Sequence, residues 1–155
     1  MKSKKGFTII EVVLVLAIAG LIFLMVFVAL PNMQKSQRDT QRRSDYAALA
    51  SAVIQYSANN GGKVPASGTS ALGATSLNSN GTDPSGYSYS VSIEEMTKDT
   101  KIGAPIINND GFTSVKIITN ADCGNGDVPT YTASNKAFVI YGALESGTYC
   151  SASSM

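Results

Sequence analysis

The chain opens with a long apolar segment. Residues 12–30 are 19 consecutive residues without a charged or strongly polar side chain, and Phe7, Ile9 and Ile10 extend this run toward the N-terminus. At a rise of about 1.5 Å per residue, a helix of this length covers roughly 28 Å, close to the hydrocarbon thickness of about 30 Å. The pattern therefore predicts a membrane-spanning helix over residues 7–31, which ends at Pro31.

A second helical pattern follows the apolar segment. Residues 34–56 are mostly polar but carry apolar side chains three, four and seven positions apart, at Tyr46, Leu49, Ala50, Val53, Ile54 and Tyr56. This period is typical of an amphipathic helix, which we expect over residues 32–60. The glycines and asparagines of residues 59–62 and the following Pro65 are expected to end it.

The remainder of the chain has the pattern of a loop and then of strands. Residues 61–86 are rich in Ser, Gly, Asn and Thr, which predicts a loop. Residues 87–93 alternate apolar residues with serine, and residues 112–119 and 136–145 are rich in β-branched and aromatic residues. We expect a small antiparallel sheet within residues 87–155. The amphipathic helix is the only element long enough to cover it, so the fold class is α+β.

Composition argues against several classes of function. The 155 residues suffice for one domain and a membrane segment. The chain contains no histidine and no GxxxxGK[ST] phosphate loop, so we expect no enzyme, no cofactor and no ATP binding.

Charge indicates the orientation in the membrane. Lys2, Lys4 and Lys5 precede the apolar segment, and the positive-inside rule keeps them in the cytoplasm and places residues after Leu30 outside. Without these three lysines, the remaining basic residues are two fewer than the 11 acidic ones. An ordinary cleavable secretory signal is the competing interpretation, but its apolar core is shorter, about 7–15 residues.

One short motif carries most of the functional information. A basic leader, a glycine, an aromatic residue and a carboxylate inside the apolar run stand in the order Lys4, Lys5, Gly6, Phe7, Thr8, Ile9, Ile10 and Glu11. This motif resembles the processing site of type IV prepilins, and the resemblance extends more weakly to about residue 65. It implies a leader of residues 1–6, cleavage after Gly6 by a prepilin peptidase, N-methylation of Phe7 and retention of the apolar helix.

Glu11 is expensive in a membrane segment, by about 2.5–3.5 kcal/mol on insertion scales, so it needs a partner or a function. In type IV pilins the matching Glu pairs with the N-terminal amine of a neighbouring subunit, which makes Phe7 and Glu11 the expected assembly contact. The alternative is an interfacial Glu that reaches the lipid headgroups. A further hypothesis is that Gly20 and Pro31 bracket a stretch of helix that melts on polymerisation.

The resemblance implies a structural subunit of a type IV pilus. It would be a precursor in the inner (cytoplasmic) membrane, and an assembly ATPase and a platform protein would then build it into an extracellular pilus by self-association. Adhesion, twitching motility and DNA uptake are properties known for such fibres, and binding of nucleic acid by this chain has no support in its overall charge. Three alternatives stay open: a pseudopilin of a type II secretion or competence apparatus, a minor pilin, and a membrane-anchored binding domain.

Cys123 and Cys150 are the only cysteines, and both fall in the part predicted to be outside, where disulfides persist. We expect them to be paired, with a stabilisation of about 3–4 kcal/mol. Similarity to pilins, which often have a C-terminal pair, implies that residues 124–149 form a variable exposed face. Two free thiols are the alternative.

Two weaker patterns concern metal ions and anions. Asp110, Asp122 and Asp127 resemble the oxygen ligands with which some pseudopilins bind calcium, but their spacing supports this weakly and we expect no metal site. A basic cluster, at Lys35, Arg38, Arg42 and Arg43, suits DNA or anionic lipid. The favoured interpretation of this cluster is a solvated face or a face that forms salt bridges between subunits.

Overall fold

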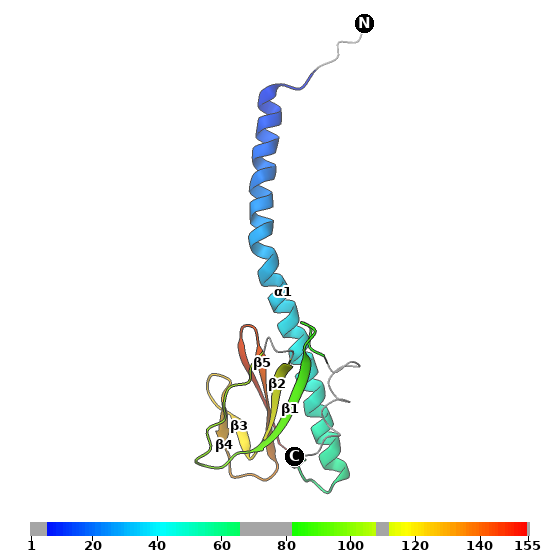
Figure 1. The fold of residues 1–155 in the computed structure, drawn as a ribbon, viewed down its shortest axis with the longest axis vertical. Coiled ribbons are helices and arrows are strands. Elements are labelled where there is room, and N and C mark those ends of the chain that lie inside the picture. Colours follow the sequence, from blue (N-terminus) through cyan, green and yellow to red (C-terminus); the bar gives the residue numbers. More distant parts are fainter. Residues whose placement is uncertain (1–5, 66–81, 108–111, 155) are drawn as a thin grey trace. The chain divides into compact units, whose positions relative to one another are not determined.

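A computed structural model describes residues 6–65, 82–107 and 112–154 of the chain (Figure 1). Its elements are α1 (Ile9–Asn59), β1 (Ser88–Glu95), β2 (Phe112–Thr119), β3 (Ala121–Cys123), β4 (Pro129–Tyr131), β5 (Ala137–Leu144) and β6 (Gly147–Ser154). The chain divides into two compact units, Met1–Ser36 and Gln37–Met155, and α1 begins in the first and ends in the second. The predicted α+β class is confirmed.

The helix differs in one respect from the pattern in the sequence. Two helical segments were expected, one before and one after Pro31, whereas Pro31 lies inside the single helix α1. Proline lacks the N–H that would donate to the carbonyl of Phe27, so one helical hydrogen bond is missing there without ending the helix. The end of α1 at Asn59 agrees with the predicted stop. Most of the predicted loop, residues 66–81, lies outside the described residues.

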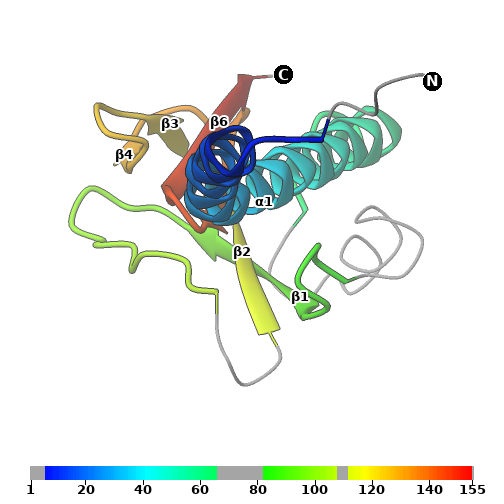
Figure 2. The same ribbon diagram turned by 90° about the horizontal axis from the view of Figure 1, so that it is seen from above.

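The main sheet has four strands in the order β1-β2-β5-β6. The strands β2, β5 and β6 are antiparallel neighbours, as expected, with Ile117 opposite Ile140 and Tyr141 opposite Cys150. The expected antiparallel arrangement does not extend to β1, which runs parallel to β2. Parallel neighbours need a crossover connection rather than a tight turn. The described part of the connection, residues 96–107, runs on the side of the sheet away from the later half of α1 (Figure 2).

The sheet is buried on both faces. Tyr46, Leu49 and Val53 of α1 pack on one face, against Val115, Ile117, Phe138 and Ile140. On the other face the β1–β2 connection contributes Met96 and Ile102, which pack with Ile118, Ala121, Val139 and Tyr141. A second, two-stranded sheet of β3 and β4 stands on the side away from the helix (Figure 1). The second unit therefore contains a helix layer, a sheet and a partial third layer.

The buried stripe of α1 is partly polar. It consists of Asp39, Arg42, Asp45, Tyr46, Leu49, Val53 and Ser57, which follow one another at helical spacing. The predicted stripe included Ile54, but this side chain is 42% exposed. Ile54 is adjacent in sequence to buried Val53, and neighbours on a helix point about 100° apart, so both cannot face the sheet.

Tyr46 approaches the sheet at a position where only glycine fits. Its ring is fully buried, stacks on Tyr149 with 5.7 Å between ring centroids, and its hydroxyl donates to the carbonyl of Ala143 at 2.7 Å. A Cβ added at Gly142 would lie within 2.8 Å of three atoms of the Tyr46 ring. Real Cβ atoms do not approach other atoms this closely, so the observed position of the Tyr46 ring requires glycine at position 142.

We expect Gly142→Ala to lower the free energy of unfolding of the second unit by about 1–3 kcal/mol, because both the ring and the strand are enclosed by the core. Urea unfolding of the full chain in detergent micelles, followed by near-ultraviolet circular dichroism of the tyrosines, measures the change. The matched control is Gly103→Ala, where an added Cβ meets nothing within 4 Å. Equal unfolding midpoints for the two variants would contradict the packing argument.

Candidate processing and assembly site

The N-terminal site is organised by the start of α1. Gly6, Phe7 and Thr8 precede the helix, which begins at Ile9. The Glu11 carboxylate accepts two hydrogen bonds at 2.9 Å, from the backbone N–H and from the hydroxyl of Thr8. A Glu at the third helical position that reaches back to the residue before the helix is one half of a capping box. It also places a negative charge at the positive end of the helix dipole.

This arrangement leaves the Gly6–Phe7 peptide bond outside the helix. Both residues are exposed, and the Phe7 side chain is 88% exposed. A peptidase can therefore reach this bond without unwinding a helical turn. The carboxylate of Glu11 lies within the first turn, four residues from Phe7, and is hydrogen-bonded to Thr8.

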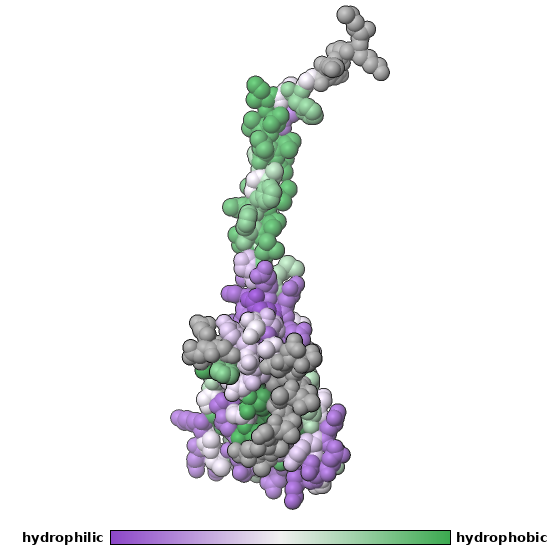
Figure 3. All heavy atoms as spheres, turned by 45° about the vertical axis from the view of Figure 1, so that its right-hand side comes forward, coloured by the Kyte–Doolittle hydropathy of each residue, from purple (hydrophilic) through white to green (hydrophobic). Residues whose placement is uncertain are grey.

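Beyond Glu11, residues 12–30 of the first unit are apolar on every side of the helix. Figure 3 shows a largely green, hydrophobic surface along this part of the chain, and its large apolar side chains are exposed. A helix that is hydrophobic all round is stable only in lipid or among other apolar helices. By length and composition α1 is able to cross a membrane.

The comparison with protein families bears on this same stretch. Residues 1–27 match the model of the prokaryotic N-terminal methylation motif. The chain carries the type IV pilin and pseudopilin signature. The match ends within the apolar part of α1, so the similarity concerns the leader and the first turns of the helix. No curated protein and no solved structure matches this chain.

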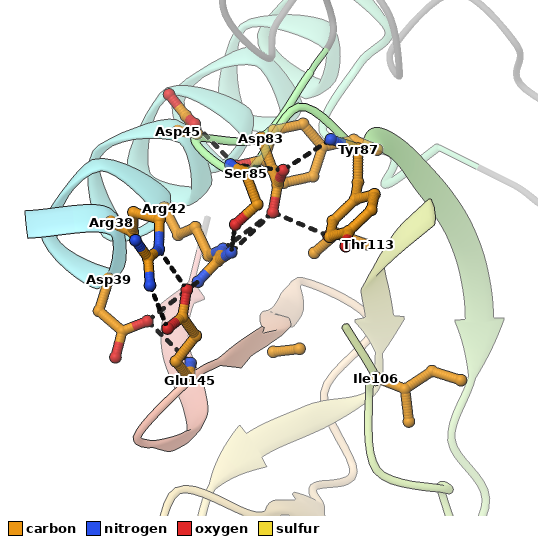
Figure 4. Close-up of polar contacts among 12 residues, drawn as sticks. Arg38, Asp39, Arg42, Asp45, Asp83, Ser85, Tyr87, Ile106, Thr113 and Glu145 are labelled. Carbon is orange, nitrogen blue, oxygen red and sulfur yellow. Dashed lines mark hydrogen bonds and ion pairs between the residues drawn. The ribbon is translucent and has the colours of Figure 1, made fainter. Parts of the chain in front are cut away.

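Two residues of the basic cluster, Arg38 and Arg42, form ion pairs within the second unit. The Arg42 side chain is fully buried, and its Nε and a terminal nitrogen donate to one oxygen of Asp83 at 3.1 and 2.8 Å (Figure 4). The other terminal nitrogen donates to Asp39 and Glu145, both at 3.2 Å. Arg38 forms a two-pronged ion pair with Glu145, at 2.6 and 2.8 Å.

Two of the carboxylates that pair with Arg42, those of Asp83 and Asp39, accept further hydrogen bonds. Asp83 accepts the backbone N–H groups of Ser85 and Tyr87 at 2.9 Å and the hydroxyl of Thr113 at 3.0 Å. Asp39 accepts backbone N–H groups from Glu145 and Ser146 at 2.8 and 3.1 Å, and the Ser146 hydroxyl at 2.7 Å. These contacts join α1 to the turn before β1 and to the turn between β5 and β6.

The geometry differs from both interpretations of the basic cluster, because Arg38 and Arg42 pair with carboxylates of their own chain. Arg38 and Arg42 are salt-bridged within the second unit, so a DNA or lipid face made of both is wrong. Arg43 is exposed, with its guanidinium 5.2 Å from the centroid of the Tyr149 ring. The acidic partners Asp83 and Glu145 were not identified from the sequence, because they lie 41 and 103 residues from Arg42.

The ion network makes stability depend on pH. The hydrogen bond from Arg38 holds the pKa of Glu145 below its ordinary value. Burial raises the pKa of Asp39, but the hydrogen bonds from Ser146 and from the backbone of Glu145 outweigh it, and the net pKa is lowered. Carboxylates with a lowered native pKa stabilise the fold above their unfolded pKa of about 4, and this stabilisation is lost as pH falls through the native pKa.

We therefore expect the urea midpoint of the full chain to be constant between about pH 7 and pH 5 and to fall below about pH 4. The double variant Asp39→Asn/Glu145→Gln should have a lower midpoint at pH 7 and a flatter pH profile. A wild-type midpoint at pH 3 equal to that at pH 7 would show that these carboxylates do not contribute.

The two cysteines form a disulfide that joins β3 to β6, with 5.8 Å between their Cα atoms. The loop that they close is not entirely a surface feature, which corrects the prediction for residues 124–149. It contains β5, a central strand whose residues 138–144 are buried.

Among the described residues no group of three or more His, Cys, Asp or Glu side chains is placed to hold a metal ion. Asp122 and Asp127 are exposed, and Asp122 accepts the backbone N–H of Cys123. Asp110 lies outside the described residues.

Proposed function

We propose that this chain is a structural subunit of a type IV pilus, cleaved after Gly6 and assembled into an extracellular filament through its N-terminal helix. The observation that carries the proposal is the methylation motif over residues 1–27 together with the part of α1, residues 12–30, that is apolar on all sides. The proposed role is assembly without bond chemistry.

The Thr8–Glu11 contact suggests how the carboxylate of Glu11 is satisfied in the membrane before assembly. A lone carboxylate in an apolar segment is costly, and the two hydrogen bonds from Thr8 satisfy part of its capacity as an acceptor. Cleavage after Gly6 removes three lysines and creates a charged amine at Phe7. The amine of a neighbouring subunit then offers Glu11 an ion pair that Thr8 cannot supply. The apolar faces of the helices pack against one another in the filament.

The proposed partners follow from this cycle. They are a prepilin peptidase, which also methylates Phe7, an assembly ATPase, a platform protein, the cytoplasmic membrane and further copies of the chain. The chain is proposed to move from the inner membrane, as the precursor, to the cell surface, as part of the pilus.

A pseudopilin of a secretion or competence apparatus is the second candidate, because the N-terminal methylation motif is common to both classes. The disulfide at the C-terminal end favours the pilin. Immunogold imaging with an antibody to the second unit separates the two candidates: long fibres made mainly of this chain support a major pilin, and their absence supports a pseudopilin or a minor pilin.

The direct test is the N-terminal sequence and intact mass of the protein recovered from its native cells. We expect a chain that begins at Phe7 and carries one additional methyl group. A mature protein that retains residues 1–6 would remove the basis of the proposal.

We expect Glu11→Gln to leave cleavage after Gly6 intact and to reduce fibres at least about tenfold. The amide can still accept from Thr8 but cannot form an ion pair, and loss of one partner of a buried pair costs about 3–5 kcal/mol. Fibres sheared from cells and quantified against total protein provide the measurement, with Asp99→Asn, on an exposed turn, as control. Wild-type fibre yield from Glu11→Gln would show that the carboxylate charge is not an assembly contact.

A further inference from the structure

A cleft lies in the second unit beside the end of α1. Its volume is about 700 Å³, which is within the range of small-ligand sites. Its walls come from four separate parts of the chain: residues 62–65 after the helix, the end of β1, the turn after β2 and the turn before β5. The Arg42 network and the N-terminal motif contribute no residue to it.

The charged and polar groups that line this cleft are mixed donors and acceptors. Lys63 and Lys136 contribute two exposed ammonium groups, and Glu95 is the one carboxylate among its lining residues. Thr119 and Asn135 add a hydroxyl and an amide. The lining therefore has a net charge of about +1 together with groups suited to hydroxyls.

Asn120 and Glu95 form a hydrogen-bonded pair in the cleft. Asn120 has a left-handed backbone conformation, with φ of 57°, and its backbone N–H donates to Ala137 at 3.0 Å. Its carbonyl accepts from Thr132 at 2.9 Å, and its side-chain amide donates to Glu95 at 3.1 Å. The two backbone hydrogen bonds hold Asn120, and its side-chain amide in turn holds the carboxylate of Glu95. Binding of a ligand to these two groups therefore costs little conformational entropy.

The apolar part of the lining is aliphatic. Val64, Pro65 and Ile93 contribute it, and none of the described residues that line the cleft is aromatic. The C–H groups of a sugar ring form van der Waals contacts with aliphatic side chains of this kind. Single-stranded nucleic acids are typically held by aromatic side chains that stack on the bases, and this lining offers none.

These observations together identify a ligand class. We propose that the cleft binds an acidic oligosaccharide: Lys63 and Lys136 contact its carboxylates, while Asn120, Asn135 and Glu95 contact its hydroxyls. The volume suits about two or three sugar rings. This activity goes beyond the assembly role and does not depend on it, since every group of the cleft belongs to the second unit of a single chain.

The test uses the full chain in lipid nanodiscs and a trimer of galacturonic acid as the probe. Binding is followed by nuclear magnetic resonance of the side-chain amides of Asn120 and Asn135. We expect saturable shifts below about 10 mM, as for a weak specific site, and a Kd at least tenfold higher for the uncharged galactose trimer. The double variant Lys63→Gln/Lys136→Gln should raise the Kd for the acidic trimer at least about tenfold, which is the loss of a charge-assisted hydrogen bond.

The control variant is Lys98→Gln/Lys101→Gln, which removes the same charge from exposed positions after β1 and should bind like the wild type. No saturable binding by the wild type overturns the proposal. Equal affinity for the two sugars, an equal loss in both double variants, or equal affinity for a thymidine trinucleotide also overturns it, in favour of unspecific charge attraction. None of these outcomes affects the methylation of Phe7, so failure here is distinguishable from failure of the pilus proposal.

Discussion

Arg42→Ala is expected to lower the free energy of unfolding of the second unit by about 3–5 kcal/mol. The substitution leaves Asp83, whose side chain is fully buried, without its cation, and it removes a contact from Asp39 and from Glu145. The remaining N–H and hydroxyl donors satisfy hydrogen bonds of Asp83 but do not balance its charge. The loss should appear as a lower urea midpoint, measured at pH 7 on the full chain in detergent micelles.

The matched control for this experiment is the next residue. Arg43 has the same side chain on the same helix, but it is exposed, and its guanidinium lies over the Tyr149 ring. Arg43→Ala should cost about 1 kcal/mol or less. If the two arginine variants unfold at the same urea concentration, the buried network does not contribute beyond an exposed cation.

A second comparison separates loss of the pair from loss of packing. In Arg42→Met/Asp83→Leu both charges are absent and the volume is roughly kept, so this variant should be more stable than Arg42→Ala. If it is less stable instead, the hydrogen bonds that Asp83 makes to the turn before β1 contribute more than the balance of charge.

The features that could be predicted from the sequence are local ones. The apolar run of residues 12–30, the stop at Asn59 and the strand at Phe112–Thr119 all depend on residues close together in the chain. The N-terminal motif is also local. The Thr8–Glu11 contact was not predicted, although the three-residue spacing of a Thr and a Glu is the sequence signal of a capping box. A periodic pattern or a capping sequence acts within a few residues, and such signals survive without knowledge of the fold.

The features that were missed depend on partners far apart in sequence. The helical stripe was predicted from apolar residues, so Arg42 was expected on a solvated face or a face between subunits, although its partner Asp83 lies on a distant turn of the same chain. Nothing near β1 specifies whether its neighbour is parallel, since the pairing with β2 follows from where the connection packs. The short strands β3 and β4 have three residues each, too few for an alternation to be recognised.

The cleft shows the same limit. Its lysines and asparagines come from positions that read as ordinary turn residues, and only the meeting of the end of α1 with the ends of β1 and β2 brings them together. A motif search does not find such a site, because its residues come from four segments that are far apart in the sequence.

Removal of the disulfide is the second large effect that we expect. Cys123 and Cys150 are separated by 27 residues, and in the chain-entropy model a loop of this length contributes about 3–4 kcal/mol to stability. The double variant Cys123→Ala/Cys150→Ala should therefore lower the free energy of unfolding by this amount. The bond joins β3 to β6, an edge strand of the main sheet, so β6 should lose protection from amide hydrogen exchange before β2 and β5 do.

The comparison that isolates the covalent bond is reduction of the wild type. Dithiothreitol leaves both side chains in place and opens only the loop, so the reduced wild type and the double variant should unfold at nearly the same urea concentration. The double variant should not respond to the reductant at all. If reduction leaves the wild-type midpoint unchanged, the core formed by Val139, Tyr141 and Ile118 holds the second face of the sheet without help from the bond.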